Sequence, residues 1–213
     1  DQVEKKSLGM SIFIVDIAHA MANGMTVNPI RNMVNHETSE LFFDQLEVPA
    51  ENLIGEEGYG FRYILDGLNA ERVLIAAECI GDGHWFLDKV VDYTKNREVF
   101  GRPIGQNQGV QFPIAEAKIE IEAADLMRFR ACELFDTGQA CGGEANMSKY
   151  LAAKASWEAA NACLQFHGGF GFATEYDVER KFRETRLYQV APISTNLILS
   201  YVAEHMLGLP RSF

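Results

Sequence analysis

Residues 61–94 read FRYILDGLNAERVLIAAECIGDGHWFLDKVVDYT, and this stretch decides the fold class. Its apolar residues return every three or four positions, for example at Ile64, Leu68, Ile75 and Cys79. That spacing places them on one face of an α-helix, whereas a half-buried strand would alternate every second residue. The stretch therefore predicts one long helix that buries an apolar face against other helices.

Helical patterns continue downstream, and glycine-containing turns separate them. Gly101 and Gly105 mark the first turn, and Gly142 and Gly143 end the second. Small residues are frequent in the helix that follows the second turn, and they permit close approach between helices. We expect a mainly α fold, an antiparallel up-and-down four-helix bundle, with further helices over residues 110–137, 144–167, 178–185 and 193–207.

The first 55 or so residues show a different residue pattern, because β-branched and aromatic residues collect between Gly, Pro and Asn. This composition is typical of strands, which we expect at residues 11–16, 25–33 and 38–48. Pro49 and three following glycines then break the pattern. The sequence thus predicts an incomplete antiparallel β segment over residues 1–56 and a helical domain over residues 57–213.

The chain has 213 residues and a net charge of −11, from 30 acidic against 19 Lys and Arg side chains. An acidic surface repels phosphate backbones and anionic membranes, so we expect no nucleic-acid partner. No apolar run approaches the ~18 residues of a membrane span, and no signal peptide is visible. We expect an intracellular protein with reduced cysteines.

Glu71 is a carboxylate among apolar neighbours on the predicted helix. It lies three residues after Leu68 and four before Ile75, so it shares their face. A carboxylate in that setting is desolvated, its pKa rises, and it becomes a candidate general base. The alternative is that Glu71 pairs with Arg72 or Lys95 at the edge of the helix.

Two loops have the composition of diphosphate-binding segments: REVFGRPIG at residues 97–105 and QFHGGFG at residues 165–171. Arginine makes bidentate contacts to phosphate, and glycine lets backbone N–H groups approach a ligand. The alternatives are a solvated turn for the first loop and a helix C-cap for the second. Neither loop is a GxGxxG motif that follows a strand, so the Rossmann fingerprint is not met.

Other chemistries lack their sequence signatures. The chain has no His-Glu-x-x-His motif and no Glu-x-x-His motif, so we expect no metal site. It also has no nucleophile elbow centred on serine, so serine hydrolysis is a poor hypothesis.

Five stretches stand in an order and at spacings that fit one known pattern without evident gaps. RxxFGxPI and QxxGGxG occur together, and this combination is specific. With the other stretches it resembles the acyl-CoA dehydrogenase family of flavoproteins. The stretches are TSELFFDQLEVPAENLIGEEGYGF (38–61), GLNAERVLIAAE (67–78), REVFGRPIGQNQGVQ (97–111), CLQFHGGFGFATEYDVER (163–180) and FRETRLYQVAPIS (182–194).

The resemblance implies a domain order. Members of that family have an N-terminal helical domain, a middle β-domain and a C-terminal four-helix bundle. Residues 1–56 would be the C-terminal part of the middle domain, and residues 57–213 would be the bundle. The chain would then be the C-terminal half of a family member, and we expect it to be inactive by itself.

The resemblance also implies a reaction. Family members remove hydrogen from the α and β carbons of an acyl-CoA thioester with FAD, and the product is a trans-2-enoyl-CoA. An electron-transferring flavoprotein reoxidises the cofactor, and the enzymes are homo-oligomers, dimers or tetramers. The compartment would be the cytoplasm in a bacterium or the mitochondrial matrix in a eukaryote.

The base does not stand where most members have it. Most place it in the loop before the last helix, where this sequence has Pro192. Isovaleryl- and long-chain acyl-CoA dehydrogenases instead carry it on the first bundle helix in a Glu-Arg pair, which Glu71-Arg72 matches. The resemblance therefore favours Glu71 as the base. In the family a backbone N–H at the Pro192 position polarises the thioester carbonyl, and because proline has no N–H, Ile193 is the candidate to substitute.

Other residue roles are carried over only as the resemblance implies them. The predicted substrate contacts are Asn69, Arg72 and Ile193. The predicted contacts to FAD, part of them to the cofactor of a neighbouring subunit, are Arg97, Phe100, Gln108, Gln165, Gly168, Gly169, Ser194 and Asn196.

Two alternatives remain beside an acyl-CoA dehydrogenase. A flavoenzyme of the acyl-CoA oxidase type has the same fold and differs in its reactivity with oxygen. A non-catalytic helical oligomerisation module would follow if the short chain were the natural product. The reading frame upstream of Asp1 would distinguish the module from the enzyme.

Overall fold

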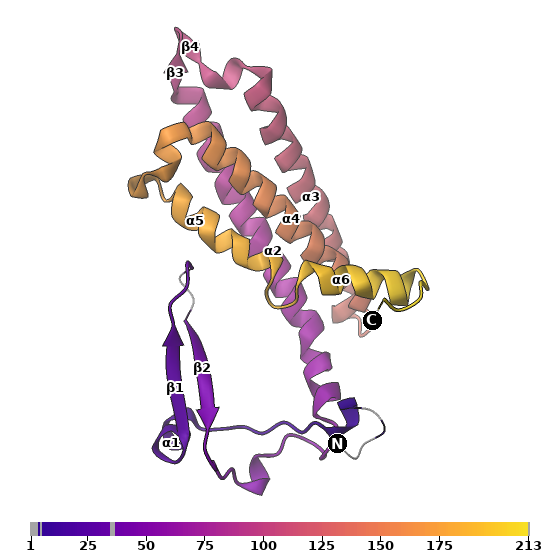
Figure 1. Cartoon of the computed structure of the whole chain (residues 1–213). Helices are drawn as coiled ribbons and strands as arrows, with labels where there is room; N and C mark the ends of the chain where they lie inside the picture. Colours follow the sequence, from indigo (N-terminus) through magenta and orange to yellow (C-terminus); the bar gives the residue numbers. More distant parts are fainter. Residues whose placement is uncertain (1–3, 5, 35–36, 213) are drawn as a thin grey trace. The chain divides into compact units, whose positions relative to one another are not determined.

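The computed structural model describes residue 4, residues 6–34 and residues 37–212. The chain divides into two compact units, Asp1–Leu68 (unit 1) and Asn69–Phe213 (unit 2). The division falls inside a helix, whereas the sequence places a domain boundary after residue 56, and that boundary stays a prediction. Each unit is described by itself (Figure 1).

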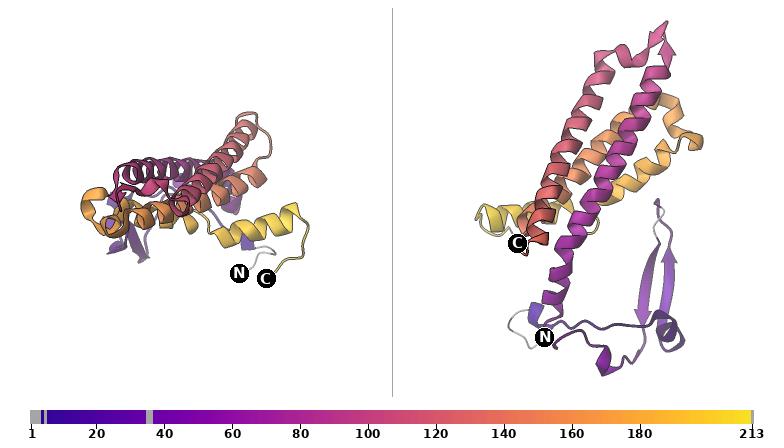
Figure 2. Two further views of the ribbon diagram at one scale, coloured as in Figure 1. Left: turned by 90° about the horizontal axis from the view of Figure 1, so that it is seen from above. Right: turned by 180° about the vertical axis from the view of Figure 1, so that it is seen from behind.

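Unit 2 is built on three long helices that run alternately up and down, and the views from two sides agree on this (Figure 2). They are α2 (Gly60–Asn96), α3 (Gln108–Asp136) and α4 (Gly142–His167). The shorter helix α5 (Val178–Thr185) packs along α4. The mainly helical fold is confirmed, and the described chain also contains small antiparallel sheets.

The C-terminal part of the bundle follows the prediction closely. The helix predicted over residues 193–207 is present as a helical run over residues 195–206, in which α6 covers Thr195–Tyr201 and a π-helical turn covers Val202–Met206. The helix begins later because Ser194 caps it: its Oγ accepts a hydrogen bond from the Leu197 N–H at 3.3 Å. The shorter helix predicted over residues 178–185 is α5, with the same bounds.

The core of unit 2 lies where α2, α3 and α4 meet. Its buried side chains include Phe86, Ile121 and Cys163, each 0% exposed. Gly83 permits the close approach, because a Cβ there would stand 2.7 Å from the Ile121 Cδ1 and 3.8 Å from the Ser156 Cα. The buried alanines of α4 likewise permit close approach between helices, as the small residues of this stretch predicted.

Unit 1 contains a short helix and a β-hairpin. Helix α1 (Ile17–Ala22) begins at Asp16, whose Oδ1 accepts a hydrogen bond from the His19 N–H at 3.0 Å. Strands β1 (Met25–Ile30) and β2 (Thr38–Phe43) pair in antiparallel register.

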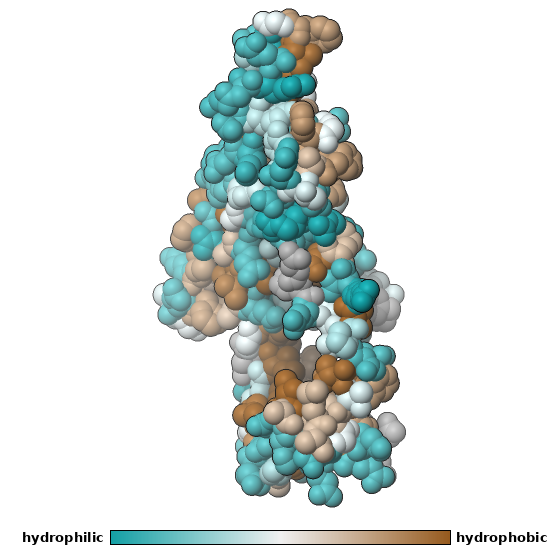
Figure 3. All heavy atoms as spheres, turned by 90° about the vertical axis from the view of Figure 1, so that its left-hand side faces the viewer, coloured by the Kyte–Doolittle hydropathy of each residue, from teal (hydrophilic) through white to brown (hydrophobic). Residues whose placement is uncertain are grey.

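The rest of unit 1 is held by turns and isolated bridges. The strand predicted over residues 11–16 is wrong: Phe13 forms only an isolated bridge with Leu53. The Gly58 N–H donates to the Ser11 Oγ at 2.9 Å. All six residues of β2 are exposed. Figure 3, which colours each residue by its hydropathy, shows hydrophobic residues in brown at the surface of the face that it draws.

No helix in the described part of the chain is long and apolar enough to cross a membrane.

Candidate functional site

A groove of about 570 Å³ lies in unit 2 where the end of α2 meets the end of α4. Helix α2 contributes Tyr93, and Arg97 follows the helix directly. Glycines and aromatic rings from the end of α4 and the turn after it form the other side. The full lining is Tyr93, Arg97, Val99, Ile104, Phe166, His167, Gly168, Gly169, Phe170 and Ala173.

A small hairpin holds Arg97 at this groove. Strands β3 (Glu98–Val99) and β4 (Arg102–Pro103) pair across Phe100 and Gly101, whose φ angles of 55° and 75° fit a two-residue hairpin turn. The Ile104 N–H donates to the Arg97 carbonyl at 2.9 Å and closes the hairpin. The Arg97 guanidinium stands 5.9 Å from the centroid of the Phe170 ring, and its charge is available to an anion.

His167 forms the buried wall of the groove. Its Nδ1–H donates to the Cys163 carbonyl at 2.7 Å, and its ring stacks on Tyr93 with centroids 4.2 Å apart. Burial lowers the pKa of the His167 imidazole, so the ring is neutral near pH 7. A neutral histidine in this place organises the wall and adds no charge to the groove.

The two glycines of the groove have different reasons to be glycine. Gly168 has a φ of 58° and a ψ of −134°, a conformation that side chains rarely adopt, and it ends α4. Gly169 has no such angle, and a Cβ added there would meet nothing within 4 Å. Packing within the described chain does not require Gly169, so its backbone is left open to a ligand. A diphosphate flanked by Arg97 fits this arrangement.

A second polar cluster lies in unit 2 near the start of α4. The Arg72 Nη1 donates to the Asn69 Oδ1 at 2.9 Å, and Arg72 is only 9% exposed. Burial lowers the pKa of the Arg72 guanidinium, while Tyr201 and Glu71 oppose that effect. Among described residues, the Arg72 Nε and the Asn146 Oδ1 are buried side-chain atoms without a hydrogen-bond partner. The cluster thus has one donor and one acceptor that make no hydrogen bond within the described chain.

Glu71 differs from its prediction. The sequence predicted a desolvated carboxylate, and this is wrong for the chain as described, because Glu71 is exposed. The helical phase points the next residue inward: Arg72 is buried and Glu71 faces outward. No carboxylate stands at the alternative position, because Pro192 is there.

The loop before α6 is anchored where it meets that helix. The Ile193 carbonyl accepts a hydrogen bond from the Lys149 Nζ at 2.8 Å. Ser194 is committed to capping α6, as described above, and Asn196 is exposed in the first turn of that helix. Three of the predicted ligand residues thus follow one another on a short, anchored segment.

Not every predicted residue reaches the groove. Arg97, Gly168 and Gly169 come together there, whereas Phe100 is 100% exposed at the tip of the β3–β4 turn. Gln108 is exposed at the start of α3. Gln165 lines a different hollow, between α3 and α4.

Sequence reasoning missed the aromatic lining of the groove, above all Tyr93 and His167. The available signal was the helical spacing, which places Tyr93 in the last turn of α2, one turn before Arg97.

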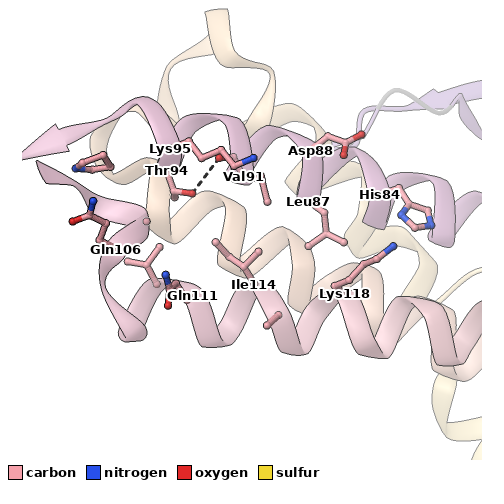
Figure 4. A pocket seen from close by; sticks show the side chains of 14 residues that line it. His84, Leu87, Asp88, Val91, Thr94, Lys95, Gln106, Gln111, Ile114 and Lys118 are labelled. Carbon is pink, nitrogen blue, oxygen red and sulfur yellow. Dashed lines mark hydrogen bonds between the residues drawn. The ribbon is translucent and has the colours of Figure 1, made fainter.

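A further hollow of about 680 Å³ lies between α2 and α3 and contains none of the predicted site residues (Figure 4). Leu87, Val91 and Ile114 give it an apolar lining, and Lys118 and His84 lie toward one end. The Thr94 Oγ1–H donates to the Val91 carbonyl at 3.3 Å, so that hydroxyl is already used. In the described residues no group of three His, Cys, Asp or Glu side chains could hold a metal ion.

Comparisons with known proteins agree with this architecture. The family model for "Acyl-CoA dehydrogenase, C-terminal domain" matches residues 58–207. Acyl-CoA dehydrogenase FadE12 of Mycobacterium tuberculosis is 40% identical over 196 residues, which are 90% of this chain and 50% of that protein. Butyryl-CoA dehydrogenase from Megasphaera elsdenii has a TM-score of 0.90 at 29% identity, over 97% of this chain and 54% of that one.

A solved structure of PigA with FAD and proline has a TM-score of 0.89 at 26% identity, over 95% of this chain and 53% of that one. The fold and the matches define a helical domain of the kind that stands at the C-terminus of acyl-CoA dehydrogenases. The chain belongs to the acyl-CoA dehydrogenase family, so the resemblance seen in the sequence is confirmed. It spans about half the length of the relatives that it matches.

Proposed function

We propose that this chain is the C-terminal half of an FAD-dependent acyl-CoA dehydrogenase, which converts an acyl-CoA thioester to its trans-2-enoyl-CoA. The observation that carries the proposal is the groove that combines the Arg97 cation with the open backbone at Gly169. A cation and accessible N–H groups are what a diphosphate requires. The family match supplies the cofactor class, because a related structure contains FAD.

The residues of this chain divide the work. A bound FAD would supply the acceptor for the hydride that leaves the β-carbon of the substrate. Arg97, Gly168 and Gly169 would hold its diphosphate, and Ser194 and Asn196 would lie near the adenine. Phe100, Gln108 and Gln165 do not line this groove, and we assign them to the cofactor of a second subunit.

Glu71 is the base in this proposal. Its carboxylate would take the α-proton of the thioester, and Arg72 and Asn69, joined by their hydrogen bond, would bind the acyl-CoA beside it. Glu71 is exposed in the chain alone, so its desolvation depends on the substrate or on a neighbouring domain. The Ile193 N–H would polarise the thioester carbonyl, because Pro192 has no N–H.

The assembly is a homo-oligomer in this proposal, as in the family, and an electron-transferring flavoprotein reoxidises it. The chain by itself would bind FAD weakly and would be inactive, because it spans about half the length of the relatives that it matches. An equimolar yellow flavin that co-purifies with the 213-residue chain would contradict this part.

The test uses the protein encoded by the complete gene. Glu71→Gln keeps the shape of the side chain and removes its basicity. General-base catalysis is worth ~10²–10⁴-fold, so flavin reduction by a suitable acyl-CoA should fall at least about a hundredfold. The FAD content should stay unchanged.

Glu78→Gln is the matched control, because Glu78 lies on the same helix and is also exposed. Stopped-flow absorbance of the flavin measures both variants. If Glu71→Gln reduces its flavin at the parent rate, Glu71 is not the base. If the reduced parent is reoxidised rapidly by oxygen, the protein is of the acyl-CoA oxidase type.

A further inference from the structure

Lys149 is a fully buried cation on α4, with 0% of its surface exposed. Its Nζ donates to the Ile193 carbonyl at 2.8 Å and also to the Tyr188 carbonyl. Both carbonyls belong to the segment that joins α5 to α6: Tyr188 lies in the 3-10 turn Arg186–Gln189, and Ile193 lies two residues before α6 begins. One ammonium group therefore bridges residues 188 and 193 of this segment.

This cation has an unusual environment. Among described residues no carboxylate pairs with Lys149, and the titratable group that acts on it is the thiol of Cys79. Burial lowers the pKa of the Lys149 ammonium. The nearby carboxylate of Asp82 is used by Lys181 and by the Tyr188 hydroxyl, at 3.2 Å. A buried, unpaired ammonium is a costly way to stabilise a fold.

Lys149 belongs to a row of contacts along one face of α4. One turn on, the Ala153 carbonyl accepts a hydrogen bond from the Gln189 Nε2 at 2.8 Å. Another turn on, the Ser156 Oγ and the Thr185 Oγ1 are 2.6 Å apart. Positions i, i+4 and i+7 share one helix face, so α4 holds the segment from Thr185 to Ile193 at successive points. Lys149 is the charged member of this row and the one that reaches Ile193.

We infer that Lys149 is a positioning residue, which fixes the loop from Tyr188 to Ile193 so that the Ile193 backbone meets the substrate in one orientation. The role rests on the proposed function, because it acts through Ile193. Its charge and three donors suit two carbonyls at once, since an ammonium has no acceptor of its own. A loop whose Pro192 lacks an N–H depends more strongly on the orientation of the next residue.

A purely structural role makes a different prediction. If Lys149 only filled space, Lys149→Met, which has a similar length and is apolar, would leave the loop unchanged. Replacing a buried charge by an apolar side chain is often neutral for the stability of the whole fold. The positioning role instead predicts that the fold survives and the loop loosens.

The first experiment measures amide hydrogen exchange in the chain described here. The Val190 and Ala191 N–H groups both donate to the Leu187 carbonyl, at 2.9 and 3.0 Å, so their exchange reports on the loop. In Lys149→Met these amides should exchange about tenfold faster or more, the factor expected for the loss of charge-assisted hydrogen bonds. Amides in the middle of α2 and α3 should keep their rates.

Lys154→Met is the matched control, because Lys154 is an exposed lysine on the same helix. It should leave the Val190 and Ala191 amides at the parent rate. Equal rates in Lys149→Met and in the parent would overturn the inference. If Lys149→Met fails to fold, NMR of the parent decides: a slowly exchanging Lys149 ammonium coupled to the Tyr188 and Ile193 carbonyls supports the tether, and its absence overturns it.

The second experiment uses the protein encoded by the complete gene and steady-state kinetics with a straight-chain acyl-CoA. Lys149→Met should lower kcat about tenfold or more, change KM less, and keep the FAD content of the parent. A parent without acyl-CoA activity would refute the proposed function and would leave the exchange result to judge the tether. A loosened loop with an unchanged kcat would overturn the positioning role.

Discussion

Unit 1 and unit 2 differ in how many of their apolar side chains they bury. Among described residues, Ala20 and Met25 are the buried apolar side chains of unit 1, whereas unit 2 buries a continuous cluster along α2, α3 and α4. In β2 the rings of Phe42 and Phe43 are 50% and 59% exposed. A two-stranded hairpin without a covered face is marginal in water. Burial of apolar side chains within unit 2 therefore stabilises that unit, whereas the described part of unit 1 buries few apolar side chains of its own.

The largest expected effect is on the core of unit 2. Phe86 is 0% exposed, so Phe86→Ala should lower the free energy of unfolding by about 3–5 kcal/mol. Phe42→Ala removes the same ring from the half-exposed hairpin of unit 1 and should cost under about 1 kcal/mol. Guanidinium titrations followed by far-UV circular dichroism, a helix signal, measure both. Similar losses would show that unit 1 supports the bundle and would break the comparison.

The same contrast explains what the sequence could predict of the fold. The 3.6-residue period of α2, α3 and α4 arises from burial within unit 2 itself, so it identified three long helices with ends correct to about two residues. Residues 11–16 failed because β-branched composition alone does not supply a strand partner. The last helix was located as closely, but its Ser194 cap and its π-helical turn were not predicted, because local hydrogen bonds rather than the period decide them.

The site was less predictable than the fold. Spacing alone singled out Glu71 as a buried position, but the predicted helical phase was off by one residue. In the structure Arg72 is buried and Glu71 is exposed. Arg97 and Gly169 meet only because α2 and α4 end side by side, a tertiary fact. The sequence did not single out Lys149, because lysines are mostly exposed and only the tertiary structure shows that this one is buried.

A second prediction concerns the surface that unit 2 leaves open. Phe112, Ile119 and Leu126 recur every seven residues on α3 and are 55%, 68% and 74% exposed. Such a stripe is rare on a soluble monomer, so we expect the chain to self-associate through α3. Ile119→Asp combined with Leu126→Asp should shift the species seen by sedimentation at micromolar concentration to the 23.8 kDa monomer.

The control for this stripe lies in unit 1. Phe43→Asp removes an apolar side chain that is 59% exposed, and it should leave the association of α3 intact. A parent chain that sediments as a clean monomer would contradict the prediction. Loss of association by Phe43→Asp alone would assign the contact to unit 1 instead.

The smallest expected effect is a pH dependence that belongs to unit 2. Burial lowers the pKa of His167 in the folded chain, whereas in the unfolded chain the imidazole titrates near its ordinary value of about 6.5. Below that value the unfolded state binds the extra proton first. The stabilising neutral form of His167 is thus fully effective above about pH 6.5, and its contribution falls as the pH drops toward the folded pKa.

Unfolding free energies of the parent and of His167→Gln at pH 7.5 and pH 5.5 measure this contribution. The parent should lose more stability between the two values, by at most about 1.4 kcal/mol, because pH 5.5 lies about one unit below the pKa of His167 in the unfolded chain. The difference between the two proteins isolates His167, because the carboxylates titrate in both. His19→Gln, at an exposed site on α1, is the control in unit 1 and should follow the parent curve. If His167→Gln also follows the parent curve, burial of His167 does not couple the end of α4 to pH, and its stacking on Tyr93 is held by packing alone.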